Sequence, residues 1–154
     1  MLLRRGSSPY HVILLAGLIA GVLDLTAALV TNGLRGLKPV RVLQAIASGL
    51  LGLDSYKGGL KTAALGVVLH FIIATAAAAI YYAASRKLKF LVRQAIVCGL
   101  LYGIAVYFFM NLVVLPLSAF PHKVSFPLSS LVTGLIVHML CVGLPISLTV
   151  PRFS

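Results

Sequence analysis

The spacing of charged residues constrains this chain more than any other feature of its sequence. Four long runs are almost free of charge, and they lie between Arg5 and Arg35, Lys61 and Arg86, Arg93 and Lys123, and Lys123 and Arg152. Each run exceeds the roughly 20 apolar residues that a helix needs to cross about 30 Å of hydrocarbon. The sequence therefore predicts transmembrane helices near residues 10–31, 61–85, 92–115 and 127–150. We expect an all-α, polytopic membrane protein in which residues 1–154 form a single transmembrane domain, a four-helix bundle.

The overall composition excludes several classes of soluble protein. Hydrophobic residues account for 60% of the chain and charged residues for 10%, and the mean hydropathy is +1.08. An ordinary soluble domain has about 45–50% apolar and about 25% charged residues, so this chain lacks the polar residues that a water-exposed surface needs. The 13 basic residues against 2 acidic ones occur in short clusters between apolar runs. This pattern indicates contact with anionic lipid headgroups rather than with nucleic acid.

The segment 39–53, between the first two predicted spans, has a different pattern. Pro39 suits the first turn of a helix. The apolar residues recur at helical spacing and the polar residues fall on another face: Leu43, Ile46, Leu50 and Leu53 against Arg41, Gln44 and Ser48. A helix of this length rises only about 22 Å, which is too short to span a bilayer. We expect a short amphipathic helix that lies in the interface or re-enters the membrane part way.

The distribution of basic residues says little about orientation. One side of the membrane would receive Arg4, Arg5, Arg86, Lys87, Lys89, Arg93 and Arg152, and the other Arg35, Lys38, Arg41, Lys57, Lys61 and Lys123. This near-equal split gives almost no bias under the positive-inside rule. The dense cluster at residues 86–89 favours cytoplasmic termini, and insertion in both orientations stays open.

Two matched segments indicate an internal repeat. Residues 16–21 (AGLIAG) correspond to residues 98–103 (CGLLYG) with an offset of 82, and residues 66–70 (GVVLH) correspond to residues 134–138 (GLIVH) with an offset of 68. The difference between the offsets is about the length of the 39–53 segment. We interpret the pattern as a duplicated hairpin of two spans with one insertion, the two halves having the same orientation.

Small residues predict where helices pack closely. Glycines four residues apart allow two helix backbones to approach, and two such pairs occur in the first and third spans. The candidate packing positions are Gly17, Gly21, Gly66, Gly99, Gly103 and Gly134. Cys98 and Cys141 fall within apolar runs, where we interpret them as small buried hydrophobic residues.

Asp24 is the strongest functional candidate in the sequence. It follows Gly17 by two helical turns and therefore shares the close-packing face. A carboxylate at this depth is costly unless it is protonated or paired, and such residues often mark a path for protons, ions or substrate. His70 is predicted at a similar depth, so the two side chains are expected to pair. The alternative is a neutral acid satisfied by a neighbouring hydroxyl or imidazole, and a histidine that only packs.

Three further residues complete the candidate list. His138 shares a helix face with Gly134 and Cys141, and we include it with Asn111 in a possible proton or substrate path. For Asn111 we expect a stabilising hydrogen bond between helices, and at Pro145 a kink in the fourth span. The sequence has no Ser-His-Asp spacing, phosphate-binding loop or Cys-x-x-Cys motif, so we expect no enzyme. Its histidine and aspartate spacing does not demand a metal.

The chain resembles a group of uncharacterised bacterial inner-membrane proteins, the YagU-like proteins. The resemblance follows the chain in order through Ile19-Ala20-Gly21, His70 in an apolar helix, Arg86-Lys87-Leu88-Lys89, Met110 with Pro116-Leu117, and Gly134 with His138. The first connection is shorter than in that group. The resemblance implies a bacterial inner-membrane location and a loose link to acid tolerance, and it implies no catalytic residues.

Three functional hypotheses are compatible with these observations. The first is a small transporter or proton-linked permease in which Asp24 titrates, His70 is its partner and the hairpins move. The second is a structural or accessory subunit of a larger membrane complex, or a stress-related protein without chemistry of its own. A homodimer packed through either glycine face also stays open. The third is a membrane protein with a b-type haem between His70 and His138, with Arg41 or Lys61 at the propionates.

Overall fold

The structure, a computed structural model, describes residues 8–153, and every regular element in that range is helical. Four segments are long and apolar enough to cross a membrane, namely Pro9–Leu34, Gly59–Lys87, Ala95–Leu117 and Leu128–Pro151. The prediction of an all-α bundle with four spans is confirmed, and the predicted boundaries differ from these by a few residues, as is usual for helix ends. The basic residues Arg4 and Arg5 lie outside the described range.

The spans consist of regular and irregular helical segments. The first span is α1 (Pro9–Leu34) and the second is α3 (Gly59–Lys87). The third combines α5 (Ala95–Phe109), η2 (Met110–Val114) and α6 (Leu115–Leu117). The fourth combines α7 (Leu128–Val137), η3 (His138–Gly143) and α8 (Leu144–Phe153). Between the spans lie α2 (Pro39–Leu51), η1 (Gly52–Lys57) and α4 (Phe90–Arg93).

Both η2 and η3 are π-helical turns, and each ends two residues before a proline. η2 ends before Pro116 and η3 ends before Pro145. Proline has no backbone N–H and its ring crowds the carbonyl four residues earlier, so the preceding turn cannot keep its regular hydrogen bonds. Before Pro145, where the sequence predicted a kink, the structure has a π turn that begins at His138, the kind of turn often found at functional sites.

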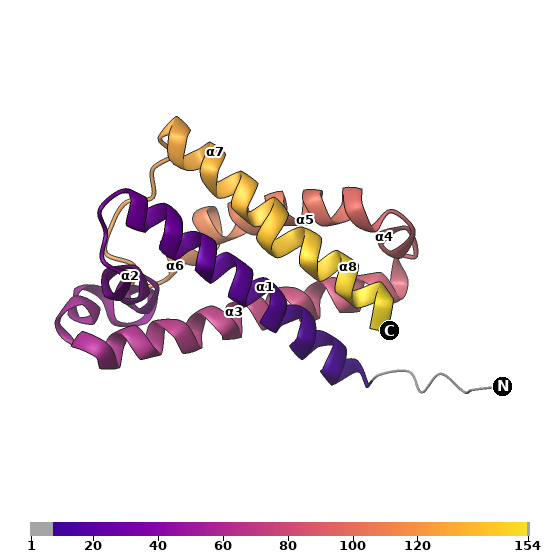
Figure 1. Cartoon of the computed structure of the whole chain (residues 1–154), viewed down its shortest axis with the longest axis horizontal. Coiled ribbons are helices and arrows are strands. Elements are labelled where there is room, and N and C mark those ends of the chain that lie inside the picture. Colours follow the sequence, from indigo (N-terminus) through magenta and orange to yellow (C-terminus); the bar gives the residue numbers. More distant parts are fainter. Residues whose placement is uncertain (1–7, 154) are drawn as a thin grey trace.

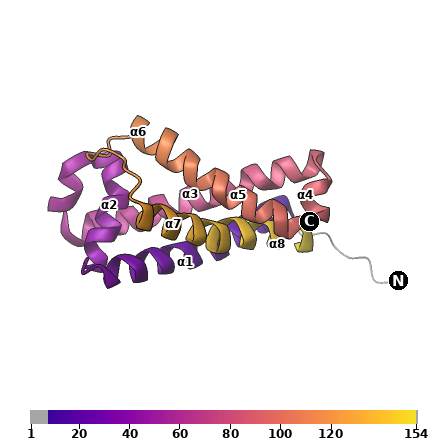
Figure 2. The ribbon, with the colours of Figure 1, turned by 90° about the horizontal axis from the view of Figure 1, so that it is seen from above.

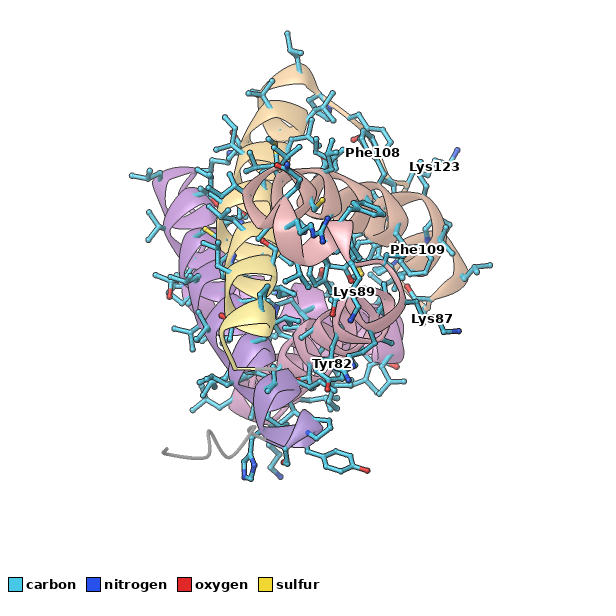
Figure 3. The ribbon with its side chains drawn as sticks, turned by 90° about the vertical axis from the view of Figure 1, so that its right-hand side faces the viewer. Tyr82, Lys87, Lys89, Phe108, Phe109 and Lys123 are labelled. Atoms are coloured by element: carbon cyan, nitrogen blue, oxygen red, sulfur yellow. The ribbon has the colours of Figure 1, made fainter. Side chains whose placement is uncertain are left out.

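The spans run alternately in opposite directions, so the connections gather at two ends of the bundle (Figure 1). α2 and α6 lie at one end, whereas α4, the start of α1 and the end of α8 lie at the other (Figure 1, Figure 2). Figure 3 looks onto the α4 end, where Lys87 and Lys89 lie, and shows Phe108 and Phe109 pointing outward from the bundle. Exposed apolar side chains between two charged ends suit a helix bundle in a bilayer.

α2 packs against the start of α3, and the face that it buries is mixed. Val42, Gln44, Ala47 and Ser48 are buried, whereas Leu50 is 60% exposed. The Gln44 side-chain amide donates to the Gly59 carbonyl over 3.0 Å. Two of the three polar residues of this helix, Gln44 and Ser48, thus lie on its buried side, whereas Arg41 is exposed. The structure shows the helix packed against α3, and its interfacial or re-entrant position stays a prediction.

Glycines bring the two helices of the first hairpin together. A Cβ atom on Gly17 would collide with the backbone of Thr75, and one on Gly21 would collide with the ring of Phe71. Both partners belong to α3. The close approach of α1 and α3 therefore depends on the absence of side chains at these two positions.

The second hairpin is packed in the same manner. A Cβ atom on Gly99 would collide with Ser147, and one on Gly103 would collide with the backbone of His138. Gly143, which the sequence did not single out, faces Gly99 and Gly103 from η3. α5 and the fourth span thus contact each other through three glycines.

The remaining pair of matched glycines has different neighbours in the two hairpins. Gly66 faces the backbone of Leu43 in α2, and Gly134 faces the ring of Tyr107 in α5. Gly66 therefore allows α2 to approach α3, whereas Gly134 makes room for a tyrosine of α5.

The half of the bundle near α4 has a well-packed core. Tyr81 is 2% exposed, and its hydroxyl donates to the Leu91 carbonyl over 3.1 Å. The Tyr102 hydroxyl donates to the Ala77 carbonyl over 2.7 Å and links α5 to α3. Small and branched side chains from α1, α3 and α8 complete this core: Ala16, Ala20, Ala78, Ile146 and Val150. Towards α2, the helices enclose a cavity instead.

Candidate functional site

Two ionisable side chains from different helices meet near the middle of the bundle. Oδ2 of Asp24 lies 3.9 Å from Nε2 of His70, and the two side chains are 17% and 13% exposed. The same His70 nitrogen lies 2.9 Å from the Gly21 carbonyl oxygen. Since a carbonyl only accepts hydrogen bonds, this nitrogen carries a proton and donates it to Gly21. The structure thus places Asp24 beside His70, at a separation longer than a hydrogen bond.

The fourth span contributes further polar groups to this region. His138 begins the π turn η3, and its Nδ1 lies 3.0 Å from the Gly134 carbonyl oxygen of its own helix. Its ring packs edge-on against Tyr107 with 5.3 Å between centroids. The fourth span therefore contributes a second histidine to the region of the Asp24–His70 pair.

Asp24, His70 and His138 line the same cavity. Its volume is about 790 Å³, which is within the range of about 300–1,000 Å³ typical of small-molecule sites. Its innermost lining residues are Ala77, Val106 and Val142. One helical turn beyond each of these, the chain enters the packed core around Tyr81 that was described above. The cavity is therefore bounded towards α4 by the core of the bundle.

The other end of the cavity is lined by residues of α2, η1 and the 118–127 connection. The guanidinium carbon of Arg41 lies 5.4 Å from the ring centroid of Tyr56. This tyrosine ring lies 6.3 Å from the ring of His122, which in turn packs edge-on against Phe120 at 5.5 Å. Arg41 and His122 are exposed. The cavity therefore extends from its inner end, past the Asp24–His70 pair, to charged and aromatic groups at the α2 end.

The wall between these two ends is almost wholly apolar. Four elements contribute to it, through Ala45, Ile46, Ile73, Met110, Val114 and Leu115. An apolar wall with few polar groups at defined positions is the usual composition of a ligand site.

Asn111 does not take part in this site. Its side-chain amide donates to the Tyr107 carbonyl of the same helix over 2.8 Å, and it is not among the residues that line the cavity. The expected hydrogen bond from Asn111 to another helix is therefore wrong. A π turn frees backbone carbonyls that a nearby amide side chain can satisfy, and Asn111 lies within η2.

The arrangement of the histidines bears on the haem and metal hypotheses. Nε2 of His70 donates to the Gly21 carbonyl, and Nδ1 of His138 lies 3.0 Å from the Gly134 carbonyl oxygen. In a neutral imidazole the other ring nitrogen is unprotonated, as a metal ligand has to be. A haem between the two histidines stays a prediction. Within residues 8–153, no group of three or more His, Cys, Asp and Glu side chains lies close enough together to hold a metal ion.

Two residues of the site were missed by sequence reasoning, and a third was considered only for haem. Tyr56 and His122 carried no recognisable signal, because they belong to connections that are far apart in the sequence. Arg41 was considered only as a partner for haem propionates. The one hint was that an arginine occurs on a helix too short to span a membrane, where a charged side chain remains at the level of the lipid headgroups.

Comparison with protein-family models, with curated proteins and with solved structures finds no match to this chain.

Proposed function

We propose that this chain is a small proton-linked transporter of the bacterial inner membrane. Asp24 takes up and releases the proton, and His70 is its partner. The observation that supports this proposal is the position of the pair, since both side chains line a cavity inside a bundle of apolar helices. Ionisable groups inside a membrane bundle are costly and commonly belong to proton or substrate paths.

The shape of the cavity suits a transport intermediate that is open to one side. Exposed Arg41 and His122 lie at one end, and the core around Tyr81 lies beyond the other. Transport then requires a second arrangement in which the core opens and the α2 end closes. The π turns η2 and η3 interrupt the spans next to the cavity, where the weaker helical hydrogen bonding allows a local change of shape.

The two hairpins supply the moving halves in this proposal. If they arose by duplication, contacts in one should recur in the other after shifts of 82 residues for the first helix and 68 for the second. The contacts Gly17–Thr75 and Gly21–Phe71 do recur in this way, as Gly99–Gly143 and Gly103–Met139. This agreement supports two similar units with the same orientation, which rock against each other around a central site in many transporters.

The first test removes the proton-binding group. We expect Asp24→Asn to reduce proton movement to the level of empty liposomes while leaving expression unchanged, because the amide fills the same space but cannot release a proton. The assay uses proteoliposomes that contain a pH-sensitive dye and carry an imposed membrane potential. Proton movement is recorded with a panel of organic anions, organic cations and neutral solutes added outside.

Asp54→Asn is the matched control. Asp54 is the second of the 2 acidic residues of the chain, and it is 79% exposed beside Lys57. The same chemical change there should leave proton movement at the wild-type rate. If Asp24→Asn moved protons at the wild-type rate, the proposal would be wrong.

A further inference from the structure

The cavity has one feature that the proposed role of Asp24 does not use, namely the positive charge of Arg41 at its outer end. The chain has 2 acidic residues. Asp54 pairs with Lys57 over 2.9 Å, and Asp24 lies beside His70. Neither carboxylate pairs with Arg41 in the described part of the chain, so its guanidinium is open to an anion from another molecule.

The groups around Arg41 are suited to an anion. The guanidinium lies over the ring of Tyr56, and stacking of this kind holds an arginine in place while its N–H groups stay available. The rings of Tyr56 and His122 lie side by side, and both side chains can donate hydrogen bonds. Arginine recognises the planar oxygen pair of carboxylates and phosphates through two parallel N–H donors.

The level of this end of the cavity matches the membrane surface. Arg41 lies in the first turn of α2, directly after the connection at which α1 ends, and α3 begins soon after η1. The ends of membrane-spanning helices lie near the lipid headgroups. An anion bound by Arg41 would therefore lie at headgroup depth, among the anionic groups of the leaflet surface.

The rest of the cavity suits an alkyl chain. Along α1 the lining runs from Asn32 to Asp24, about 12 Å at the helical rise. Along α3 it continues from His70 to Ala77, about 10 Å further. One leaflet contributes about 15 Å of hydrocarbon, so the apolar interior is long enough for the chain of a leaflet lipid.

We propose that the cavity binds a single-chain amphiphile with an anionic headgroup. The carboxylate or phosphate is held at Arg41, Tyr56 and His122, and the alkyl chain fills the apolar interior towards Val106. This orientation keeps the headgroup away from the Asp24 carboxyl, where a second negative charge would be repelled. The inference rests on the proposed function in one respect, namely that the cavity is the transport site. It adds the class of substrate that this site binds.

Binding is measured on the full-length protein in nanodiscs of zwitterionic phosphatidylcholine. The probe is the fluorescent fatty acid dansyl-undecanoate, and empty nanodiscs provide the background. Laurate, dodecyl phosphate and dodecyltrimethylammonium have the same chain and different headgroups. We expect laurate, dodecyl phosphate or both to displace the probe and dodecyltrimethylammonium to fail. The stronger of the two anions identifies the headgroup as a carboxylate or a phosphate.

Substitutions locate the site. Arg41→Gln should weaken binding of the anionic probe about tenfold, which corresponds to about 1.4 kcal/mol, and Arg41→Lys should weaken it less. Lys38→Gln is the matched control, since Lys38 is exposed in the same connection but does not line the cavity, and it should bind within twofold of wild type. Val106→Trp should reduce binding by filling the interior.

Two results would overturn this inference. One is equal displacement by dodecyltrimethylammonium and laurate, which needs no variant and hence no assumption about folding. The other is wild-type affinity in Arg41→Gln.

Failure of the transporter proposal is recognised separately. If anionic amphiphiles bind as expected but Asp24→Asn leaves proton movement unchanged, the transport role fails. If Asp24→Asn abolishes proton movement but the headgroup series fails, the substrate class is wrong.

Discussion

At the scale of single residues, the His70 side chain has two roles, a hydrogen bond between helices and a position beside the Asp24 carboxyl. Its Nε2 donates to the Gly21 carbonyl and lies beside Asp24. The hydrogen bond connects α3 to α1, and the ring position that it imposes determines which part of the imidazole faces the carboxyl. A bond of this kind between membrane helices contributes about 0.6 kcal/mol on average and up to about 1.7 kcal/mol.

We expect His70→Phe to lower the free energy of unfolding by about 1 kcal/mol, because phenylalanine occupies a similar volume but cannot donate to Gly21. His70→Gln, which retains an N–H donor, should recover part of this loss. The measurement is unfolding in detergent mixtures of increasing denaturing strength. Ile72→Phe is the control, since Ile72 is 58% exposed on the outer face of α3. Equal stability of His70→Phe and wild type would contradict the assigned hydrogen bond.

The depth of residues in each span was enough to predict that Asp24 and His70 meet. The Gly21 hydrogen bond was not predictable in this way. It depends on how closely α1 and α3 approach and on the rotamer of one ring, and both are consequences of packing rather than of spacing along the chain. The same reasoning explains why Asn111 was placed incorrectly, since nothing in its neighbours along the sequence showed that it lies in a π turn.

At the scale of elements, glycine contacts decide which helices form pairs. α5 and the fourth span approach so closely that Gly99, Gly103 and Gly143 all lie in the interface. A side chain at any of these positions has to displace backbone atoms, which is more costly than displacing the end of a flexible side chain.

We expect Gly103→Leu to destabilise the bundle by at least about 1–3 kcal/mol, the usual cost of overpacking. The Leu side chain would collide with the backbone of His138 and Met139, so the thermal unfolding temperature in detergent should fall. Gly33→Leu is the matched control, since Gly33 is helical and exposed and has nothing within 4 Å of its added Cβ. Its unfolding temperature should stay the same or rise with the better helix propensity of leucine. A similar fall in both variants would mean that helix contact is not the cause.

The amphipathic pattern of α2 identified a helix too short to span the membrane, but not the direction of its faces. In water an amphipathic helix buries its apolar face. In lipid no such preference exists, because leucine is as well accommodated by acyl chains as by protein. Gln44 is therefore buried together with Val42 and Ala47, where it donates to the Gly59 carbonyl, and Leu50 and Leu51 are exposed.

At the scale of the whole molecule, the two ends of the bundle have different roles. The α4 end contains the packed core and the cluster around Lys87 and Lys89, and the α2 end contains the opening of the cavity. Which end faces the cytoplasm determines the direction from which a ligand enters. The basic cluster at residues 86–89 favours the cytoplasm for the α4 end, and we propose that both termini lie there.

Reporter fusions test this orientation. We expect green fluorescent protein fused after Ser154 to fluoresce and alkaline phosphatase at the same position to be inactive, because the first matures in the cytoplasm and the second outside it. The same reporters inserted after Lys57 should give the opposite result. An active phosphatase at the C-terminus with no fluorescence would reverse the orientation. Activity of both reporters at one position would show that the chain inserts in both directions.

The sequence by itself determined the number of spans, their approximate ends and their alternating directions. These properties depend on the length of apolar runs and on where charges interrupt them, and both are local features of the chain. The glycine pairs of the first and third spans also identified the faces through which α1 and α5 contact other helices, because helical periodicity fixes which residues share a face. The partner helices were not predicted.

Only the tertiary structure decided what surrounds the cavity. Arg41, Tyr56 and His122 come from segments separated by up to 81 positions in the sequence, and they meet because α2 folds back onto α3 while the 118–127 connection lies at the same end of the bundle. Contacts between distant segments depend on the relative placement of whole helices. No periodicity within a single helix determines that placement, and for this reason the charged end of the cavity became visible only in the folded chain.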